Sequence, residues 1–471
     1  MFKHQDDTTP YDELVEKWTP LLDHESIEPI DDYYKKKVTA VLLENQQDAL
    51  REQYVNEQAN IIGGNFSNPQ VGNDVSALAG YDPVLISLVR RSMPNLMAYD
   101  LCGVQPMTAP TGLIFAIRAK YSTQDGDEAL VQEALPFAGA SAGSGPGALS
   151  GYTNDDLTTG LSFEAFTDGT RNSGLTFTNG DFRGMSTAQA EKLGAGGTNL
   201  EFQQMAFDID RIAVEAKTKA LKAEYTTELA QDLKAVHGLD AETELANILS
   251  TEILSELNRE VIRTLYHVAK LGCQQVDIQS STGVYDLYAD SDGRWSAERF
   301  RGLMFQIERE ANIIAKDTRR GKGNFVVCTS DVASALAMGG FLNISPALNV
   351  ALDSDDTGNT FVGTLNGKFK VYIDPYASSN LGGNTTPDYC VVGYRGASPY
   401  DAGFFYCPYV PLQMVRAVDP DTFQPKIGFK TRYGMVANPF AKSKDLGVQG
   451  GNQYYRIFGV QNLHGLGGVT S

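Results

Sequence analysis

Residues 93–121, MPNLMAYDLCGVQPMTAPTGLIFAIRAKY, decide the fold, because a stiff and directed segment leads there into a strand. Pro106 and Pro110 cannot donate to a β-ladder, and each favours an extended conformation in the residue before it. A Pro-Thr-Gly turn then comes directly before the strand. The segment is therefore predicted to be an extended arm that reaches towards something outside its own domain.

The strand after the arm alternates apolar with other side chains over residues 113–121. Phe115 and Ile117 belong to the apolar set, whereas Arg118 and Lys120 belong to the other set. A period of two is typical of a half-buried strand. The apolar set is predicted to face the core, and Arg118 and Lys120 are predicted to form a basic outward face.

Long helical patterns lie on either side of this region. Residues 202–237 keep one apolar stripe, which predicts a single helix roughly 50 Å long that ends at Gly238. Asp240 is a suitable N-cap for the helix that follows. Further helices are predicted over residues 11–57 with a break at 24–32, over 84–96, over 240–265 and over 298–316.

The remaining chain favours strands and turns. Residues 122–200 are rich in glycine, which predicts hairpins and irregular loops. The stretch IIGGNFSNPQVGND after residue 60 has no period and is typical of a linker. The C-terminal third reads as successive strands that are not interleaved regularly with helices. The fold class is therefore predicted to be α+β.

Composition excludes several classes of function. The formal net charge of −19 argues against a general nucleic-acid binder, which needs Lys and Arg to neutralise phosphates. Residues 1–57 hold 14 acidic and 6 basic side chains, so this segment alone carries −8. No apolar run is long enough to cross a bilayer, and the N-terminus is too polar for a secretory signal. The five separate cysteines predict buried free thiols rather than disulfides or a zinc site.

Searches for a chemical site give weak candidates only. The basic, glycine-rich residues 318–327 precede a strand instead of opening a helix, so a turn is favoured over a phosphate cradle. Residues 351–359 resemble the start of a calcium loop, but Thr364 stands where a bidentate glutamate is needed. The five histidines form no known catalytic motif. No catalytic, cofactor or metal site is predicted.

Three separated stretches together resemble a known family. They are LVRRSMPNLMAYDLCGVQPMTAPTGLIFAIRAKY, EYTTELAQDLKAVHGLDAETELANILSTEILSELNREVI and FQPKIGFKTRYGMVANPF. They are similar to the major capsid proteins of T4-like contractile-tailed bacteriophages, and the resemblance covers most of residues 84–440. It implies a structural, non-enzymatic protein with an HK97-like fold that forms hexamers in an icosahedral head shell.

The resemblance also implies a division of the chain. It comprises a helical acidic propeptide (1–57), a linker and N-terminal arm (58–112), an extended loop (113–201), a peripheral domain with a spine helix (202–325), an axial domain with returning strands (326–440) and a C-terminal tail (441–471). The arm and the strand that carries Arg118 and Lys120 are expected to contact acidic surfaces of neighbouring subunits.

Members of this family are precursors whose N-terminal segment is cut after a glutamate in an aliphatic-x-Glu context. Val55-Asn56-Glu57 is the preferred match, with the cut between Glu57 and Gln58; Leu50-Arg51-Glu52 is the alternative, with the cut between Glu52 and Gln53. The resemblance implies virion localisation after assembly in the host cytoplasm. It also implies these partners: copies of itself, a vertex capsid protein, a scaffold protein, a maturation protease, a portal, decoration proteins, an assembly chaperone and packaged DNA as non-specific content.

Three other functions stay open on the sequence alone. A vertex capsid protein, which forms pentamers with the same fold, is the nearest. A glycine-rich cell-surface binding protein would also be rich in strands, although a secretion signal is then expected. A cysteine-dependent hydrolase would need one reactive thiol among the five cysteines.

Overall fold

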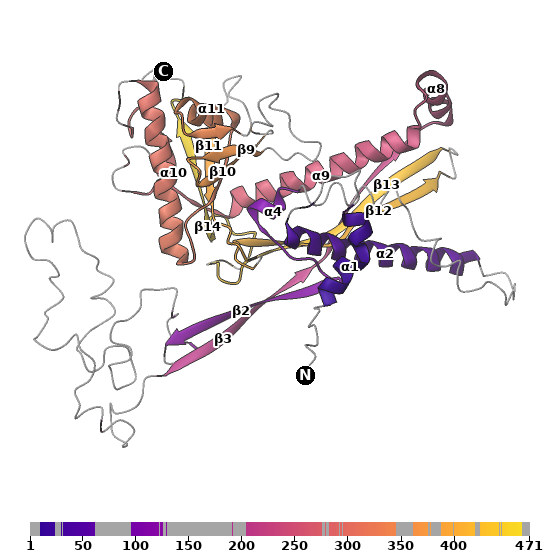
Figure 1. Cartoon of the computed structure of the whole chain (residues 1–471), viewed down its shortest axis with the longest axis horizontal. Helices are drawn as coiled ribbons and strands as arrows, with labels where there is room; N and C mark the ends of the chain where they lie inside the picture. Colours follow the sequence, from indigo (N-terminus) through magenta and orange to yellow (C-terminus); the bar gives the residue numbers. More distant parts are fainter. Residues whose placement is uncertain are drawn as a thin grey trace, which may run out of the picture. The chain divides into compact units, whose positions relative to one another are not determined.

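The computed structural model describes residues 10–23, 30, 32–61, 96–121, 123–125, 129, 191, 204–275, 278, 282–291, 293, 295–344, 361–374, 377, 388–398, 400–419, 424–441, 443 and 445–463. The chain divides into two units, one of residues 1–114 and 212–471 and one of residues 115–211. Figure 1 labels the elements in chain order. The predicted helix near 84–96, most of the glycine-rich stretch and the calcium-like loop at 351–359 lie outside the described residues.

Helices occur in two groups, one near the N-terminus and one in the middle of the chain. The first group is α1 (Pro10–Leu22), α2 (Tyr33–Ile61) and the short α4 (Ala98–Leu101). The second is α8 (Thr227–His237), α9 (Ala241–Val268), α10 (Ser296–Thr318) and α11 (Ser330–Met338).

The boundary between α8 and α9 follows the predicted signals. Gly238 ends α8 in the left-handed conformation with φ 69°, which a residue with a Cβ rarely adopts. The Asp240 side chain then accepts a hydrogen bond from the Glu242 amide and caps α9. Both of these sequence predictions are confirmed.

A four-stranded sheet lies beside the long helix α9 (Figure 1). Its strand order is β1-β12-β13-β4. β12 and β13 are antiparallel, and β13 pairs antiparallel with β4. The strands are β1 (Gly103–Val104), β4 (Lys217–Glu224), β12 (Phe404–Val418) and β13 (Pro425–Ala437).

An eight-stranded mixed sheet carries α10 and α11 and has the order β5-β14-β11-β7-β10-β9-β8, with β6 also pairing β14. Its central strands consist of consecutive apolar residues because other parts of the fold cover both faces of the sheet. All four residues of β7 are buried. The strands are β5 (Ala269–Leu271), β6 (Val284–Asp286), β7 (Phe325–Cys328), β8 (Leu342–Ile344), β9 (Phe361–Leu365), β10 (Phe369–Ile373), β11 (Asp388–Gly393) and β14 (Asn452–Gln461).

A separate two-stranded ribbon consists of β2 (Thr111–Tyr121) and β3 (Met205–Glu215). The predicted strand at 113–121 is therefore confirmed. Together, the helices and the three sheets confirm the predicted α+β class.

The prediction of one helix over 202–237 is wrong. Residues 205–215 and 217–224 are the strands β3 and β4, and only 227–237 form a helix. β4 pairs with β13 along its whole length, from Lys217 opposite Tyr433 to Glu224 opposite Lys426. This pairing overrides the helical propensity of the Ala- and Lys-rich sequence. The longest helix of the middle group is α9, with 28 residues.

Two large apolar cores stabilise the fold. One joins α9, the N-terminal helices, α4 and the inner face of the four-stranded sheet. The other lies between α10, α11 and the eight-stranded sheet. The segment predicted as a C-terminal tail contributes β14 to that sheet, between β5 and β11.

Candidate assembly surfaces

The arm is held along the edge of the four-stranded sheet. β1 pairs parallel with β12, with Gly103 opposite Phe405. Beyond β1, the Gln105 amide donates to the Tyr406 carbonyl at 2.9 Å, and the Met107 amide donates to the Pro408 carbonyl at 2.9 Å. The arm is extended, as predicted, but within this chain it runs as an added edge strand of its own unit, where prolines are tolerated; that it also reaches another subunit stays a prediction.

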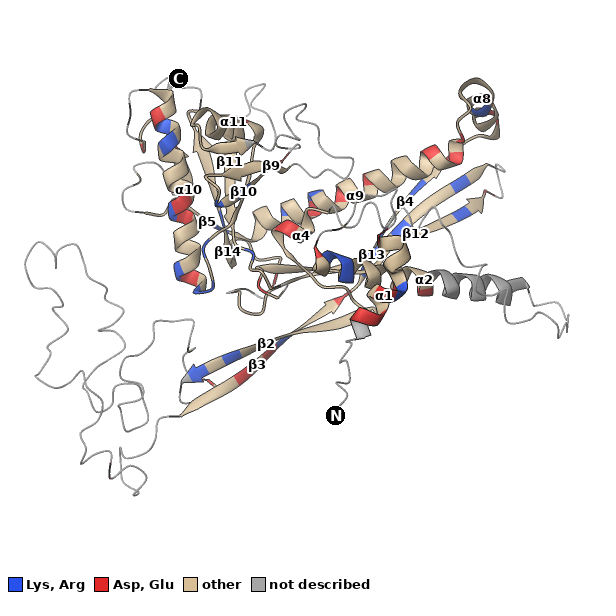
Figure 2. Ribbon diagram, viewed as in Figure 1, with Lys and Arg blue, Asp and Glu red and all other residues tan. Residues whose placement is uncertain are grey.

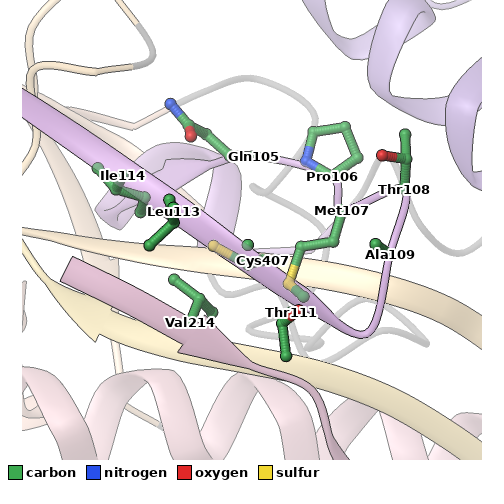
Figure 3. Close-up of a pocket in the computed structure, with 11 residues that line it drawn as sticks. Gln105, Pro106, Met107, Thr108, Ala109, Thr111, Leu113, Ile114, Val214 and Cys407 are labelled. Atoms are coloured by element: carbon green, nitrogen blue, oxygen red, sulfur yellow. The ribbon is translucent and has the colours of Figure 1, made fainter. Parts of the chain in front are cut away.

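A small cavity of about 150 Å³ lies where the arm turns into β2 (Figure 3). The arm and β2 line most of it, and Val214 and Cys407 complete it. The Cys407 thiol is buried, and burial raises its pKa to about 12. This thiol is therefore protonated at neutral pH and carries no nucleophilic chemistry.

The ribbon presents an apolar face, which reverses the predicted orientation. Phe115 and Ile117 are 62% and 66% exposed, whereas the neighbouring Ala116 is buried. On β3, Phe207 and Ile209 are 71% and 64% exposed. The prediction that the apolar set of this strand faces a core is therefore wrong for the isolated chain.

Charged residues of the ribbon pair with each other on the opposite face. The Arg118 Nε atom lies 2.9 Å from an oxygen of Asp210, and the Lys120 Nζ atom lies 3.7 Å from an oxygen of Asp208. Figure 2 shows the basic residues of β2 beside the acidic residues of β3. The basic face is therefore neutralised largely within the ribbon, and a contact of Arg118 or Lys120 with another subunit stays a prediction.

The N-terminal helices are docked on the arm and on β12. The Asn45 side-chain amide donates to the carbonyls of Met107 and Tyr409, at 2.7 and 2.9 Å. The Tyr34 hydroxyl donates to the Val104 carbonyl. Trp18 of α1 is buried in the same core. The acidic segment is thus an integrated part of the fold in the uncut chain.

The four cleavage candidates, Glu52, Gln53, Glu57 and Gln58, lie in the second half of α2. The helix runs to Ile61, so it continues beyond the predicted start of the linker. The cut after Glu57, with Glu52 as the alternative, stays a prediction.

No chemical centre is formed by the described part of the chain. All five cysteines are buried and unpaired with each other, as predicted, and burial raises the pKa of every one of their thiols. Among the described residues no group of three or more His, Cys, Asp or Glu side chains could hold a metal ion. The residues between α10 and β7 connect a helix to a strand, as predicted for 318–327, and Lys322 there pairs with Glu308. Within the same residues, no helix has the length and apolarity needed to span a membrane.

Some of these surface features were not found from the sequence. Asn45 gave no signal, because a single polar residue in a helix is usually solvated. The exposed side chains of β3 did give one: FDID at residues 207–210 alternates apolar with acidic residues at a period of two. That alternation was overlooked because residues 202–237 as a whole also fit the apolar stripe of a helix.

A contiguous exposed apolar face such as that of the ribbon is typical of a protein–protein interaction surface. The profile of the family described as Major capsid protein Gp23 matches residues 78–460. The major capsid protein of Enterobacteria phage T4 is 37% identical over 490 residues, which cover 92% of this chain and 92% of that protein. The chain therefore belongs to the Gp23 major capsid protein family, whose members are structural proteins of the virion and not enzymes.

Two further comparisons reach more distant proteins. The capsid vertex protein of the same phage is 29% identical over 264 residues, which cover 53% of this chain and 56% of that protein. A solved structure described as the capsid of Myoviridae phage XM1 is 10% identical with a TM-score of 0.36, and the match covers 78% of this chain and 92% of that one. Family membership therefore rests on the major capsid proteins, and it removes the cell-surface and hydrolase alternatives.

Proposed function

We propose that this chain is the hexamer-forming subunit of an icosahedral phage head, made as a precursor and matured by proteolysis. In this proposal the fold is HK97-like, with residues 103–110 as the N-terminal arm, the β2–β3 ribbon as the base of the extended loop and α9 as the spine helix. The mature subunit encloses DNA as non-specific content.

The observation that carries the proposal is the apolar face of the ribbon. Successive side chains of a strand point to opposite faces. The ion-paired residues of β2 and β3 have even numbers and lie on one face, so the odd-numbered residues lie on the opposite face. These are Phe115, Ile117, Met205, Phe207 and Ile209, each more than half exposed. Soluble monomers rarely leave such a patch uncovered. We expect a neighbouring copy of the chain to bury this apolar face, since other copies are the proteins that surround each subunit during assembly.

The proposed maturation cut is the bond between Glu57 and Gln58, with Glu52–Gln53 as the alternative. A protease binds an extended chain, so the substrate segment must leave the helix. Helix ends fray most easily. Glu57 lies about one turn from the end of α2, whereas Glu52 lies more than two turns inside it. The shorter unwinding favours Glu57.

The proposed partners follow from this role. They are other copies of this chain, a vertex capsid protein, a scaffold protein, a maturation protease, a portal, decoration proteins and an assembly chaperone, with assembly in the host cytoplasm. The alternative role, a pentamer-forming vertex protein, is disfavoured. The match to a known vertex protein covers 53% of the chain, against 92% for the major capsid protein of the same phage.

The test is expression of the chain with its scaffold, followed by negative-stain microscopy. Wild-type protein should form closed shells with six-fold capsomers. Phe207→Asp should block shell formation while leaving the subunit folded, because a carboxylate on the ribbon would have to be desolvated at the contact. Met338→Asp is the matched control, since Met338 is 70% exposed on α11 and Phe207 is 71% exposed. Normal shells from Phe207→Asp would refute the ribbon contact.

A further inference from the structure

The N-terminal helix pair, defined as α1 and α2, occupies a surface that the rest of the chain has already built. The arm pairs with β12 through its own backbone hydrogen bonds, and Tyr99 and Leu101 belong to a core that also includes α9 and both large sheets. The helix pair adds Trp18, Leu22 and Leu42 to this core from one side. The surface beneath the pair is therefore preformed by elements that do not depend on it.

Specific hydrogen bonds align the pair on this surface. Asn45 bridges the arm and β12 by donating to Met107 and Tyr409, one carbonyl from each. About three turns away along α2, the Tyr34 hydroxyl donates to the Val104 carbonyl. Within the pair, Lys17 of α1 lies 2.6 Å from Glu44 of α2, and the Trp18 indole donates to the same carboxylate. The two helices thus dock as one body.

One residue of α2 opposes this docking. Gln46 is fully buried, and neither its amide nitrogen nor its amide oxygen has a hydrogen-bond partner among the described residues. Burying an amide without a partner is unfavourable, because its hydrogen bonds to water are lost and not replaced. The next residue, Gln47, accepts a hydrogen bond from Lys17 at 3.1 Å and is only partly buried. The misfit is therefore specific to position 46.

We propose that residues 96–107 together with β12 form a binding surface for the N-terminal helix pair that persists after the chain is cut, and that Gln46 limits the affinity so that the cut segment can leave. The helix pair is held by the burial of its apolar side chains and by the two hydrogen bonds of Asn45. The buried amide of Gln46 offsets part of the binding free energy. Only the release of the segment after cleavage rests on the proposed maturation. The contact between the helix pair and the arm with β12 exists in the uncut chain.

The first test is hydrogen exchange of the intact, unassembled subunit, followed over residues 33–49. Gln46→Leu should raise the protection of these amides by roughly tenfold, because it removes the unpaired amide at similar volume. Asn45→Ala should lower their protection by a similar factor. Gln47→Leu is the matched control and should change little. Peptides from α10 give the internal reference. If Gln46→Leu protects no more than Gln47→Leu, or lowers protection, the role of Gln46 is overturned.

The second test separates the contact from maturation. A recognition sequence for a site-specific protease is inserted within residues 62–70 of the full chain, and the purified subunit is cut and passed over a size-exclusion column. The segment should co-elute at high concentration and dissociate on dilution, and Gln46→Leu should shift that dissociation to about tenfold lower concentration. Equal dissociation of both proteins would overturn the proposal. Failure of the phage protease to cut Glu57 would leave this result unaffected.

Discussion

At the scale of single residues, the buried carboxylate of Glu310 on α10 is held by several partners. Arg456 of β14 pairs with it at 3.0 Å, and both side chains are buried. The other carboxylate oxygen accepts hydrogen bonds from the Cys273 amide and from the side chains of Gln275 and Gln306. A buried ion pair is stable only when such additional partners satisfy its atoms. This network ties α10 to β14 and to the segment that follows β5.

We expect Glu310→Gln to lower the free energy of unfolding by about 3 kcal/mol, because the buried Arg456 guanidinium then keeps only the more distant Asp317 carboxylate, 3.9 Å away, as a counter-charge. Urea unfolding followed by circular dichroism measures the change. Glu308→Gln, on the same helix, is the control and should cost less than ~1 kcal/mol, since the Glu308 pairs with Lys322 and Lys368 are partly exposed. Equal losses in the two variants would contradict a special role for Glu310.

The pH dependence of Glu308 has a definite sign. Hydrogen bonds from Lys322 and Lys368 hold the pKa of Glu308 below its usual value. Its contribution to stability is therefore present above the pKa of the unfolded chain and is lost as the pH falls through the lowered pKa of the folded chain. Between neutral pH and that acidic range, wild-type protein should lose slightly more stability than Glu308→Gln. A steeper loss in the variant would contradict the assignment.

The five cysteine thiols should react slowly with thiol reagents in the native state. Burial raises the pKa of Cys328 and Cys407 to about 12, so at pH 8 only about one thiol in 10⁴ is ionised. We expect a thiol reagent to label all five cysteines slowly in the folded subunit and rapidly in urea. One cysteine that reacts within seconds in native protein would contradict this picture.

At the scale of elements, the sequence predicted those that carry their own signals. α9 was found because Gly238 and Asp240 mark its start just before an apolar stripe, and β7 and β11 lie in the part of the chain that was predicted to consist of successive strands. β4 was missed because KTKALKAE has the composition of a helix and becomes a strand only through its pairing with β13. The exposed side of β2 could not be assigned for a related reason: no other described residue covers its apolar side chains, so the usual inference from apolar to buried fails.

Arg118 gives the sharpest test of how the ribbon works. If its partner is Asp210 of the same chain, Arg118→Asp should impair shell assembly by destabilising the ribbon, and adding Asp210→Arg should restore it. If its partner is an acidic residue of another subunit, the double variant should stay defective. Shell yield by sedimentation measures both outcomes, and the pair Lys120→Asp with Asp208→Lys gives an independent repeat. Normal assembly of both single variants would leave these residues without a role in assembly.

At the scale of the whole molecule, the charge distribution and the docking of the N-terminal segment act in opposite directions. Residues 1–57 carry −8 of the net −19, which would repel packaged phosphate if the segment stayed on the inner side of the shell. Yet α1 and α2 bury apolar side chains in the largest core of the subunit. A cut alone therefore does not remove the charge, and the segment must also dissociate from the arm and β12.

The last prediction is that subunits from DNA-filled heads lack residues 1–57. Intact mass spectrometry of finished particles should give a mass that starts at Gln58, because the last turn of α2 unwinds more easily than the interior. Glu57→Ala should block this cut, whereas Glu52→Ala should leave it unchanged. A new N-terminus at Gln53 would instead identify Glu52 as the site and show that the protease opens more than two turns of the helix. Full-length subunits in filled heads would refute removal of the segment, and with it the idea that the acidic residues must leave before DNA enters.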